Sequence, residues 1–467
     1  MAEYYDELLK LCGFDDDEID RERPRIEKVF KKLGIVPEDM EPAQNWVRQN
    51  HDVELSGVRK LLAAWLKELI DLVLAKDEGK KVVYYGFPTI SGPGMAIAAA
   101  SDDIYAACPD VVLCHTMGQI FNKLNPILEA GEENGLPPGH GLCSLQQIRV
   151  GAMAMGIIPV PDMVLTSSYY CDAGSKTDEL LHERYGHPAF YVDGSMDSAW
   201  GEFPGYLPQR VEFLGTELDQ LFIEAKKILG AEVTREVWDR TMSVSRQLYS
   251  GISQLAGLMK ADPMPVSQTA VGLATWLSSG SVGRAITEGP GAIAVLNEEV
   301  KKRVDEGIGV VEKGAPRVIT LITNYSDASI TRMIENCGLA LCGTVYSAPV
   351  PKREGPPVAY KSLGEEIADR EMIIGNYHSS YGIVKRCAKA IKDLNVDGLI
   401  FNYLFNCRPL AQLSHFLKKW VEENTGIPTL SLEADNYDSR SYGAETLRTR
   451  VETFAELLRA KKGAAVR

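Results

Sequence analysis

Short apolar, β-rich runs alternate with helical stretches in two separate blocks of the chain, and this alternation constrains the fold most. The first block contains VVYYGF (82–87), VVLC (111–114), MVLTSS (163–168) and AFYVD (189–193). The second contains VITLIT (318–323), LALCGTVYS (339–347), GLIFNYLF (398–405) and TLSLE (429–433). Strands that alternate with helices are typical of βαβ units around a parallel sheet. We therefore predict an α/β fold of two Rossmann- or flavodoxin-like lobes with parallel sheets.

Helical patterns precede and separate these two blocks. The segment 57–76 places leucine, tryptophan, isoleucine and valine side chains at helical spacing, which predicts a helix with a broad apolar face. We predict four regions: a helical N-terminal region (1–80), a first α/β lobe (81–230), a helical connecting region (231–315), and a second α/β lobe that closes with a helix (316–467). In open α/β sheets, ligands bind beyond the carboxyl ends of the strands, and a cleft between lobes is a common place for them.

The charge balance narrows the classes of partner. The 467 residues include 50 Lys+Arg and 64 Asp+Glu, a formal net charge of −14, and the basic residues form no continuous run. Such a surface repels a polyphosphate, so we expect no nucleic-acid partner, although a local basic pocket for a small anion stays open. No apolar run approaches the ~18–20 residues that span a bilayer, and the acidic N-terminus is unlike a signal peptide. We expect a cytoplasmic protein with no membrane segment and reduced thiols.

The nine cysteines are distributed unevenly over this predicted fold. Cys171 and Cys407 follow predicted strands, Cys143 precedes a predicted helix, and Cys114 ends the run 111–114. Backbone N–H groups at such positions favour anionic sulfur. No C-x-x-C occurs, which excludes a zinc ribbon, a thioredoxin-type couple and a ferredoxin-type run. Two interpretations remain open: inert, half-buried thiols, or an iron–sulfur cluster held by dispersed cysteines from both lobes.

The other cysteines give weaker signals. Cys12, Cys337 and Cys387 lie in helical patterns, where core packing is the better interpretation, and Cys342 lies inside a strand-like run and is ambiguous.

Three side chains near these positions are candidates for proton transfer. His115 follows Cys114, His140 lies three residues before Cys143, and Glu433 ends the last predicted strand, two residues before Asp435. The more usual interpretation of each is structural: a packed histidine, or a carboxylate that caps the next helix. The chain has no G-x-x-x-x-G-K-[ST] loop and no G-x-G-x-x-G after a strand, so we expect neither ATP hydrolysis nor a nicotinamide cofactor in this chain.

Several longer stretches resemble one known family. They are LCSLQQIRVGAMAMG, PDMVLTSSYYCDAGSK, DGLIFNYLFNCRPL, IPTLSLEADNYD and LRTRVETFAELL. They resemble the iron–sulfur subunits of the 2-hydroxyacyl-CoA dehydratase and ATP-dependent benzoyl-CoA reductase family, and the resemblance covers roughly residues 80–460. It implies a [4Fe–4S] cluster between the two lobes, held by Cys143, Cys171 and Cys407. Arg408 departs from the pattern, since many members carry Asp after the third cysteine.

The resemblance leaves several functions open. The chain's mass of 51.4 kDa and its helical N-terminus favour the larger cluster-bearing subunit of an ATP-dependent benzoyl-CoA reductase, an oxidoreductase of anaerobic aromatic degradation that reduces the ring to a cyclic dienoyl-CoA. The first alternative is a subunit of a 2-hydroxyacyl-CoA dehydratase, a lyase. A double-cubane cluster on the same scaffold would need further ligands from Cys342 or Cys114. A cluster-free scaffold subunit is the alternative outside enzymology.

The resemblance also implies partners. They are a second cluster-bearing subunit of the same family, an ATP-hydrolysing activator with its own [4Fe–4S] cluster, and ferredoxin or a similar upstream electron donor. The substrate would be an acyl-CoA, whose phosphates need local positive charge. Arg149, Lys176 and Arg408 lie close in sequence to the three cysteines and are the candidate CoA contacts.

Overall fold

The computed structural model of the chain describes residues 3–86, 90–137, 143–168, 171–195, 201–280, 283–321, 326–374, 380–403, 407–433 and 435–465. Two four-stranded parallel sheets are covered and connected by many helices. The prediction of an α/β fold with two flavodoxin-like lobes is therefore confirmed.

The first sheet has the strand order β2-β1-β3-β4. Its strands are β1 (Lys81–Tyr85), β2 (Ile104–Ala107), β3 (Met163–Ser167) and β4 (Ala189–Val192). Strand β1 lies between β2 and β3, with Val83 opposite Ala106 on one side and Met163 on the other. Every residue of β2 and β3 is buried, as expected for strands covered on both faces. The direction of the strand order reverses between β1 and β3, and in open α/β sheets ligands bind at such a point.

The helices of this lobe correct one prediction. They are α5 (Ser91–Ala99), α6 (Pro109–Leu113), α7 (Asn125–Glu133), α8 (Ser144–Ala154), α9 (Asp172–Tyr185) and α10 (Pro208–Leu229). The run VVLC was predicted to be a strand, but it lies in α6 and in the π-helical turn η2 (Cys114–Gly118), and the strand is β2 instead. Four apolar residues do not distinguish helix from strand by periodicity, whereas Pro109 at the first helical position favours the helix.

The second sheet repeats the topology of the first, with the order β6-β5-β7-β8. Its strands are β5 (Arg317–Thr320), β6 (Ala340–Thr344), β7 (Gly398–Tyr403) and β8 (Thr429–Glu433). Its helices are α14 (Ser329–Asn336), α15 (Leu363–Met372), α16 (Ser380–Asp393), α17 (Arg408–Thr425) and α18 (Ala444–Ala465). In each sheet the first strand of the lobe pairs with the second and third, so β3 and β7 hold equivalent positions.

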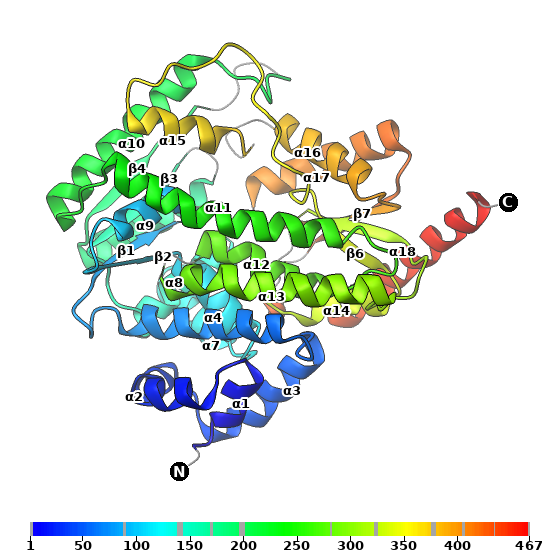
Figure 1. The fold of residues 1–467 in the computed structure, drawn as a ribbon, viewed down its shortest axis with the longest axis horizontal. Helices are drawn as coiled ribbons and strands as arrows, with labels where there is room; N and C mark the ends of the chain where they lie inside the picture. Colours follow the sequence, from blue (N-terminus) through cyan, green and yellow to red (C-terminus); the bar gives the residue numbers. More distant parts are fainter. Residues whose placement is uncertain are drawn as a thin grey trace.

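A helical layer connects the two sheets. It comprises α4 (Ser56–Leu74), α11 (Arg235–Leu258), α12 (Gln268–Gly280) and α13 (Arg284–Glu306), while α1 (Asp6–Leu11), α2 (Asp16–Leu33) and α3 (Met40–Asn50) lie at the N-terminal end. Figure 1 shows α4, α11 and α13 running across the molecule from the side of β1 and β2 to the side of β6 and β7. Helix α4 is almost entirely buried, and its Trp65 Nε1 donates to the Leu273 carbonyl at 3.1 Å.

One helix of the second lobe packs on the first. Helix α15 lies between β6 and β7 in sequence, but it is side by side with α10 (Figure 1). The backbone N–H of Gly364 donates to Asp219 of α10 at 2.9 Å. The Tyr206 hydroxyl, just before α10, donates to Asp369 at 2.8 Å. These two bonds hold α15 against the first lobe.

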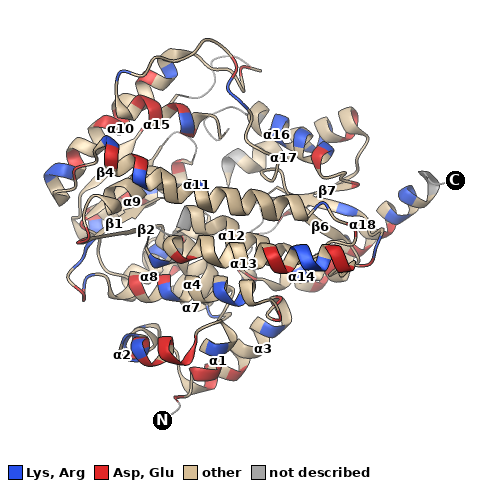
Figure 2. Ribbon diagram, in the orientation of Figure 1, with Lys and Arg blue, Asp and Glu red and all other residues tan. Residues whose placement is uncertain are grey.

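Charged residues of both signs are interspersed along the outer helices. Figure 2 shows Lys and Arg beside Asp and Glu on α2, α10, α15 and α13, whereas much of α11 and α12 carries neither. Among the described residues, no helix combines the length and the apolar character that a bilayer crossing requires.

Candidate functional site

Three cysteines occupy the same structural position, the residue that caps the N-terminus of a helix. Cys143 caps α8, Cys171 caps α9 and Cys407 caps α17. Cys171 follows β3 and Cys407 follows β7, so these two cysteines come from equivalent strands of the two sheets. Three helices of 11, 14 and 18 residues therefore direct the positive ends of their dipoles toward these sulfurs.

The three thiols lie close enough to affect one another's ionisation. Burial raises the pKa of Cys143 well above its usual value, and Cys171, Asp435 and Cys407 raise it further. Burial also raises the pKa of Cys407 to about 12, with contributions from Cys171 and Asp435. The backbone N–H groups of Gln146 and Leu410, in the first turns of α8 and α17, act in the opposite direction. The structure thus brings together the three cysteines that the sequence singled out.

Asp435 connects the two lobes at this point. Its Oδ2 accepts hydrogen bonds from the Ser144 hydroxyl at 2.6 Å and from the Ser144 backbone N–H at 3.2 Å. Ser144 directly follows Cys143, so a carboxylate of the second lobe holds the first turn of α8. Burial raises the pKa of Asp435, and the bonds from Ser144 and the Tyr437 backbone N–H lower it. A second link between the lobes joins Arg440 to Glu132 at 2.6 Å.

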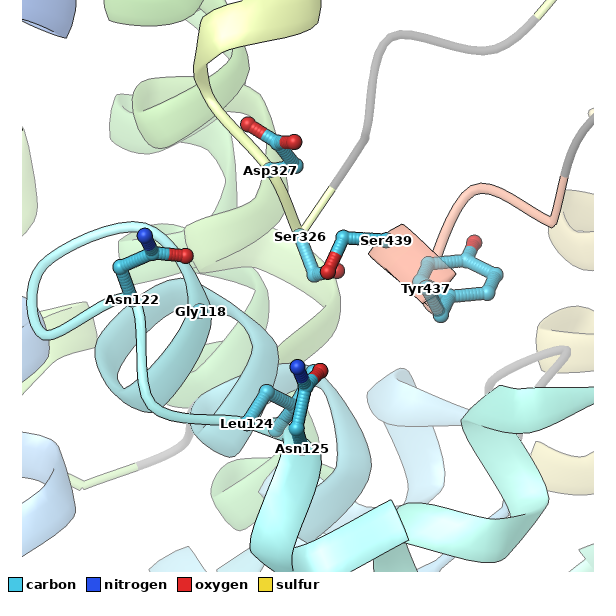
Figure 3. Close-up of a pocket in the computed structure, with 8 residues that line it drawn as sticks. All are labelled: Gly118, Asn122, Leu124, Asn125, Ser326, Asp327, Tyr437 and Ser439. Carbon is cyan, nitrogen blue, oxygen red and sulfur yellow. The ribbon is translucent and has the colours of Figure 1, made fainter. Parts of the chain in front are cut away.

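Tyr437 is the aromatic residue of this group. It is 4% exposed, and its pKa is raised by burial and by Cys114, Cys143, Asp435 and Cys407. It also lines a recess of about 10 Å³ between the lobes, where Ser326 and Asp327 lie beside Tyr437 and Ser439, across from Leu124 and Asn125 (Figure 3). That volume suits about one water molecule and excludes a CoA ester from this recess.

The two cysteines considered as extra ligands differ in their surroundings. Cys114 is buried in the π-helical turn η2 and interacts with Asp110, Cys108 and Asp435. Cys342 is buried in β6, where its thiol donates to the Val318 carbonyl at 3.3 Å. Cys114 thus shares Asp435 and Tyr437 with two of the three capping cysteines, whereas Cys342 is bonded within its own sheet.

Arg149 has a different place from the predicted CoA contact. Its guanidinium is fully buried, donates to Asp110 at 2.8 Å and forms an ion pair with Asp178. Arg149 lies on α8 and Asp178 on α9, so this pair ties together the two helices that Cys143 and Cys171 cap. A guanidinium without exposed surface cannot contact a phosphate group that arrives from solvent. Arg149 is therefore a positioning residue, and the prediction of a CoA contact is corrected.

A second buried arginine lies on the side of the second lobe. The Arg386 guanidinium donates to the carbonyls of Ile374, Tyr346 and Ala348 at 2.7, 3.0 and 3.3 Å. Its carbon lies 5.1 Å from the centre of the Tyr346 ring, and Cys407 raises the pKa of Tyr346. Arg386 forms no ion pair within the described part of the chain, and burial lowers its pKa. It therefore places uncompensated positive charge near Cys407.

The remaining predicted residues that the structure describes lie in three different environments. His115 is buried, its ring stacks on Trp65 with centres 4.3 Å apart, and its Nδ1–H donates to the Val111 carbonyl at 2.8 Å. Burial lowers its pKa to about 4, so the ring is neutral at pH 7. Glu433 is exposed at the end of β8. Lys176 is exposed and pairs with Asp172 at 2.9 Å. His140 and the Arg408 side chain lie outside the described residues.

Sequence reasoning underrated Asp435 and missed Tyr437. Both follow β8 in the quoted stretch IPTLSLEADNYD, yet only Glu433 was chosen as a candidate. Leu432 of this strand is buried, and Glu433 beside it is exposed. A prediction that extended two to four residues beyond the strand end would have included the buried pair.

The three capping cysteines are of the donor type that iron–sulfur clusters use. Iron–sulfur clusters are held by cysteine thiolates, and three of the capping residues supply such groups from two lobes. No three potential ligands among the described residues are close enough for one mononuclear metal ion. A four-iron cluster is wider than one ion, so its ligands stand farther apart.

Comparisons with known proteins identify relatives of this chain. A family model described as "2-hydroxyglutaryl-CoA dehydratase, D-component" matches residues 102–458. The (R)-phenyllactyl-CoA dehydratase alpha subunit of Clostridium sporogenes is 22% identical over 402 residues, 84% of this chain and 92% of the relative. The (R)-2-hydroxyglutaryl-CoA dehydratase subunit alpha of Acidaminococcus fermentans is 21% identical over 318 residues, 66% of this chain and 63% of the relative. The (R)-2-hydroxyisocaproyl-CoA dehydratase alpha subunit of Clostridioides difficile is 18% identical over 342 residues, 69% and 78% of the two chains.

Proposed function

Because the chain belongs to the 2-hydroxyglutaryl-CoA dehydratase D-component family, we propose that it is a subunit of a 2-hydroxyacyl-CoA dehydratase. The relatives reported above are all alpha subunits of such dehydratases. The sequence had favoured a benzoyl-CoA reductase, and a lyase is now the better-supported choice. The observation that carries the proposal is the meeting of Cys143, Cys171 and Cys407 from two lobes at three helix starts.

Those three cysteines would hold a [4Fe–4S] cluster. When bound, such a cluster supplies a low-potential electron and, with three protein ligands, one iron open to substrate or water. The helix starts of α8, α9 and α17 favour the thiolates that metal binding requires. Asp435 holds the start of α8 against the second lobe, and Arg149 holds α8 against α9. These residues fix the spacing of the three sulfurs.

The proposed reaction removes water from the acyl chain. The C2–O and C3–H bonds of a 2-hydroxyacyl-CoA break, and a C2=C3 double bond forms. The buried walls around Cys143 and Tyr437 exclude solvent from the reacting atoms. Lys176 is exposed close to Cys171, and we retain it, with Arg408, as a proposed contact for CoA phosphate.

The partners follow from the same proposal. The relatives are named as alpha subunits, so at least one further subunit accompanies each of them. We propose a second subunit of the same family for this chain, together with an activator that hydrolyses ATP and transfers an electron from ferredoxin or a similar donor.

The test is anaerobic turnover of the complex with its activator, ATP and a reductant. We expect 2-enoyl-CoA from a panel of 2-hydroxyacyl-CoA substrates, and loss of turnover in Cys171→Ala. Cys337→Ala serves as the control, because Cys337 is a half-buried residue at the end of α14. Formation of a cyclic dienoyl-CoA from benzoyl-CoA, with no dehydration, would reject the dehydratase in favour of the reductase.

A further inference from the structure

One buried side-chain amide beside the cysteines has no partner. Gln146 lies in the first turn of α8, three residues after Cys143, and is fully buried. Neither the oxygen nor the nitrogen of its side-chain amide forms a hydrogen bond to any described residue. Buried polar groups in folded proteins nearly always have a partner, and an exception calls for an explanation such as a bound water, an ion or a redox group.

The next residue of the helix shows the usual case. Gln147 is also buried, and its Nε2 donates to the Leu136 carbonyl at 2.9 Å. The two adjacent glutamines therefore differ in one respect. The amide of Gln147 has a partner within the chain, whereas that of Gln146 has none among the described residues.

The backbone places Gln146 at the sulfur of Cys143. Its N–H donates to the Cys143 carbonyl at 3.0 Å, and the same N–H lowers the pKa of the Cys143 thiol. Side chains of a helix lean toward its N-terminus. The Gln146 side chain therefore extends toward the end of α8 that Cys143 caps.

Neither helix capping nor the nearby water site explains this amide. The third residue of a helix often accepts a hydrogen bond from the backbone N–H of the capping residue. In α2, Glu18 accepts such a bond from Asp15 at 3.2 Å, but Gln146 makes no such bond to Cys143. The recess beside Tyr437, which suits one water molecule, is lined by residues 118–125 and by the second lobe, with no contribution from α8.

The equivalent positions of the other two cysteine-capped helices carry no amide. In α17 this position is Leu410, and in α9 it is a glycine. The Leu410 backbone N–H acts on Cys407 as that of Gln146 acts on Cys143. The backbone contact to sulfur is thus common to α8 and α17, whereas the side-chain amide is present only in α8.

We propose that the Gln146 side-chain amide donates a hydrogen bond to a sulfur atom of the [4Fe–4S] cluster and raises the reduction potential of that cluster. This inference rests on the cluster of the proposed function. Reduction adds negative charge to the cluster, so an N–H donor stabilises the reduced form, and hydrogen bonds to the sulfurs are among the determinants of cluster potentials. Gln146 is then a positioning residue that acts through the cluster and favours electron uptake from the activator.

The first test compares Gln146→Leu with Gln147→Leu in the iron-loaded full chain. Leucine is the residue that α17 carries at the equivalent position. We expect Gln146→Leu to lower the equilibrium constant for cluster reduction about tenfold, a shift of about 59 mV to more negative potential for a one-electron couple. Gln147→Leu should keep the wild-type potential, because its amide is bonded to the Leu136 carbonyl. Equal midpoint potentials of Gln146→Leu and the wild type in a redox titration would overturn the inference.

A second measurement detects the hydrogen bond without relying on a stable variant. In the wild-type chain with ¹⁵N-labelled glutamine side chains, pulsed electron paramagnetic resonance of the reduced cluster should show a magnetic coupling to one side-chain nitrogen. Gln147→Leu should keep this coupling, and Gln146→Leu should lose it. A wild-type cluster without any coupling to a glutamine side chain would overturn the inference.

These outcomes separate the inference from the proposed function. A wild-type chain that binds no iron would reject the proposed cluster, and with it the role of Gln146. An iron-loaded chain with neither the coupling nor the shift in potential would reject the role of Gln146 alone. A chain that shows both, in a complex that dehydrates no 2-hydroxyacyl-CoA, would retain the role of Gln146 and reject the dehydratase.

Discussion

The two lobes have the same strand order but place different numbers of cysteines at the starts of helices. In the first lobe, α8 and α9 each begin after a cysteine and are tied together by Arg149 and Asp178. In the second lobe only α17 begins after a cysteine. Helix α16, which precedes β7 as α8 precedes β3, begins at Ser380 after the sequence GNYHS. One topology therefore supplies two ligand candidates on one side and a single candidate on the other.

The buried arginines near the cysteines also differ between the two lobes. Arg149 in the first lobe is balanced by Asp110 and Asp178. Arg386 in the second lobe has only backbone carbonyls and the Tyr346 ring within the described residues, and the neighbouring segments 375–379 and 404–406 contain no Asp or Glu. The first lobe neutralises its own buried charge, whereas the second leaves positive charge beside Cys407. A duplicated fold thus gives two unequal halves of one site.

The largest effect on stability is expected from breaking the balanced network. Arg149→Met leaves Asp110 and Asp178 buried without a counter-charge, which should lower the free energy of unfolding by about 3–5 kcal/mol in urea titrations. Arg386→Met is the matched variant of the second lobe. It removes hydrogen bonds to carbonyls only, and we expect a smaller loss of about 1–3 kcal/mol. Equal losses would remove the electrostatic distinction between the lobes.

A pH-dependent effect is expected where the second lobe meets the connecting helices. Burial raises the pKa of Glu335 from 4.5 to about 7, although Arg332 and the bonds from Ser267 and Gln268 lower it. The folded state then binds more protons than the unfolded state between pH 4.5 and 7, so the free energy of unfolding falls as pH rises through this range, by up to about 3 kcal/mol. Urea titrations at several pH values should show a flatter profile for Glu335→Gln. The same slope in both proteins would contradict this assignment.

A smaller effect is expected at the link between the lobes. Ser144→Ala removes the hydroxyl that donates to Asp435 at 2.6 Å, and the backbone N–H bond at 3.2 Å stays. We expect a loss of about 1–2 kcal/mol in the free energy of unfolding. Ser414→Ala, which removes a hydroxyl bonded within α17, should stay within about 0.5 kcal/mol of the wild type. A Ser144→Ala variant as stable as the control would show that Asp435 does not hold the lobes together.

The sequence supported the fold class and the choice of cysteines because both depend on local signals. Continuous apolar runs identify buried parallel strands, and Cys171 and Cys407 immediately follow two of them. Local signals fail where a run is short, as for 111–114, which is helical here. They also fail for a side chain whose partner is distant in sequence. No residue close to Arg149 in sequence indicates that it is buried beside Asp110 and Asp178.

Long-range packing also hid the position of α15. This helix lies between β6 and β7 in sequence, but it packs on α10 of the first lobe. The couplings among Asp435, Tyr437 and the cysteines likewise join residues about 300 positions apart. Hydrophobic periodicity and motif spacing carry no information about contacts between residues so far apart in sequence.

The most direct test of the central claim is the iron and acid-labile sulfide content of the anaerobically purified chain. We predict about four irons per chain, and loss of most of the iron in Cys143→Ala, Cys171→Ala and Cys407→Ala, whichever lobe carries the change. Cys337→Ala should keep the wild-type content. Iron content unaffected by the three substitutions, or a wild-type chain without iron, would contradict a cluster shared between the lobes.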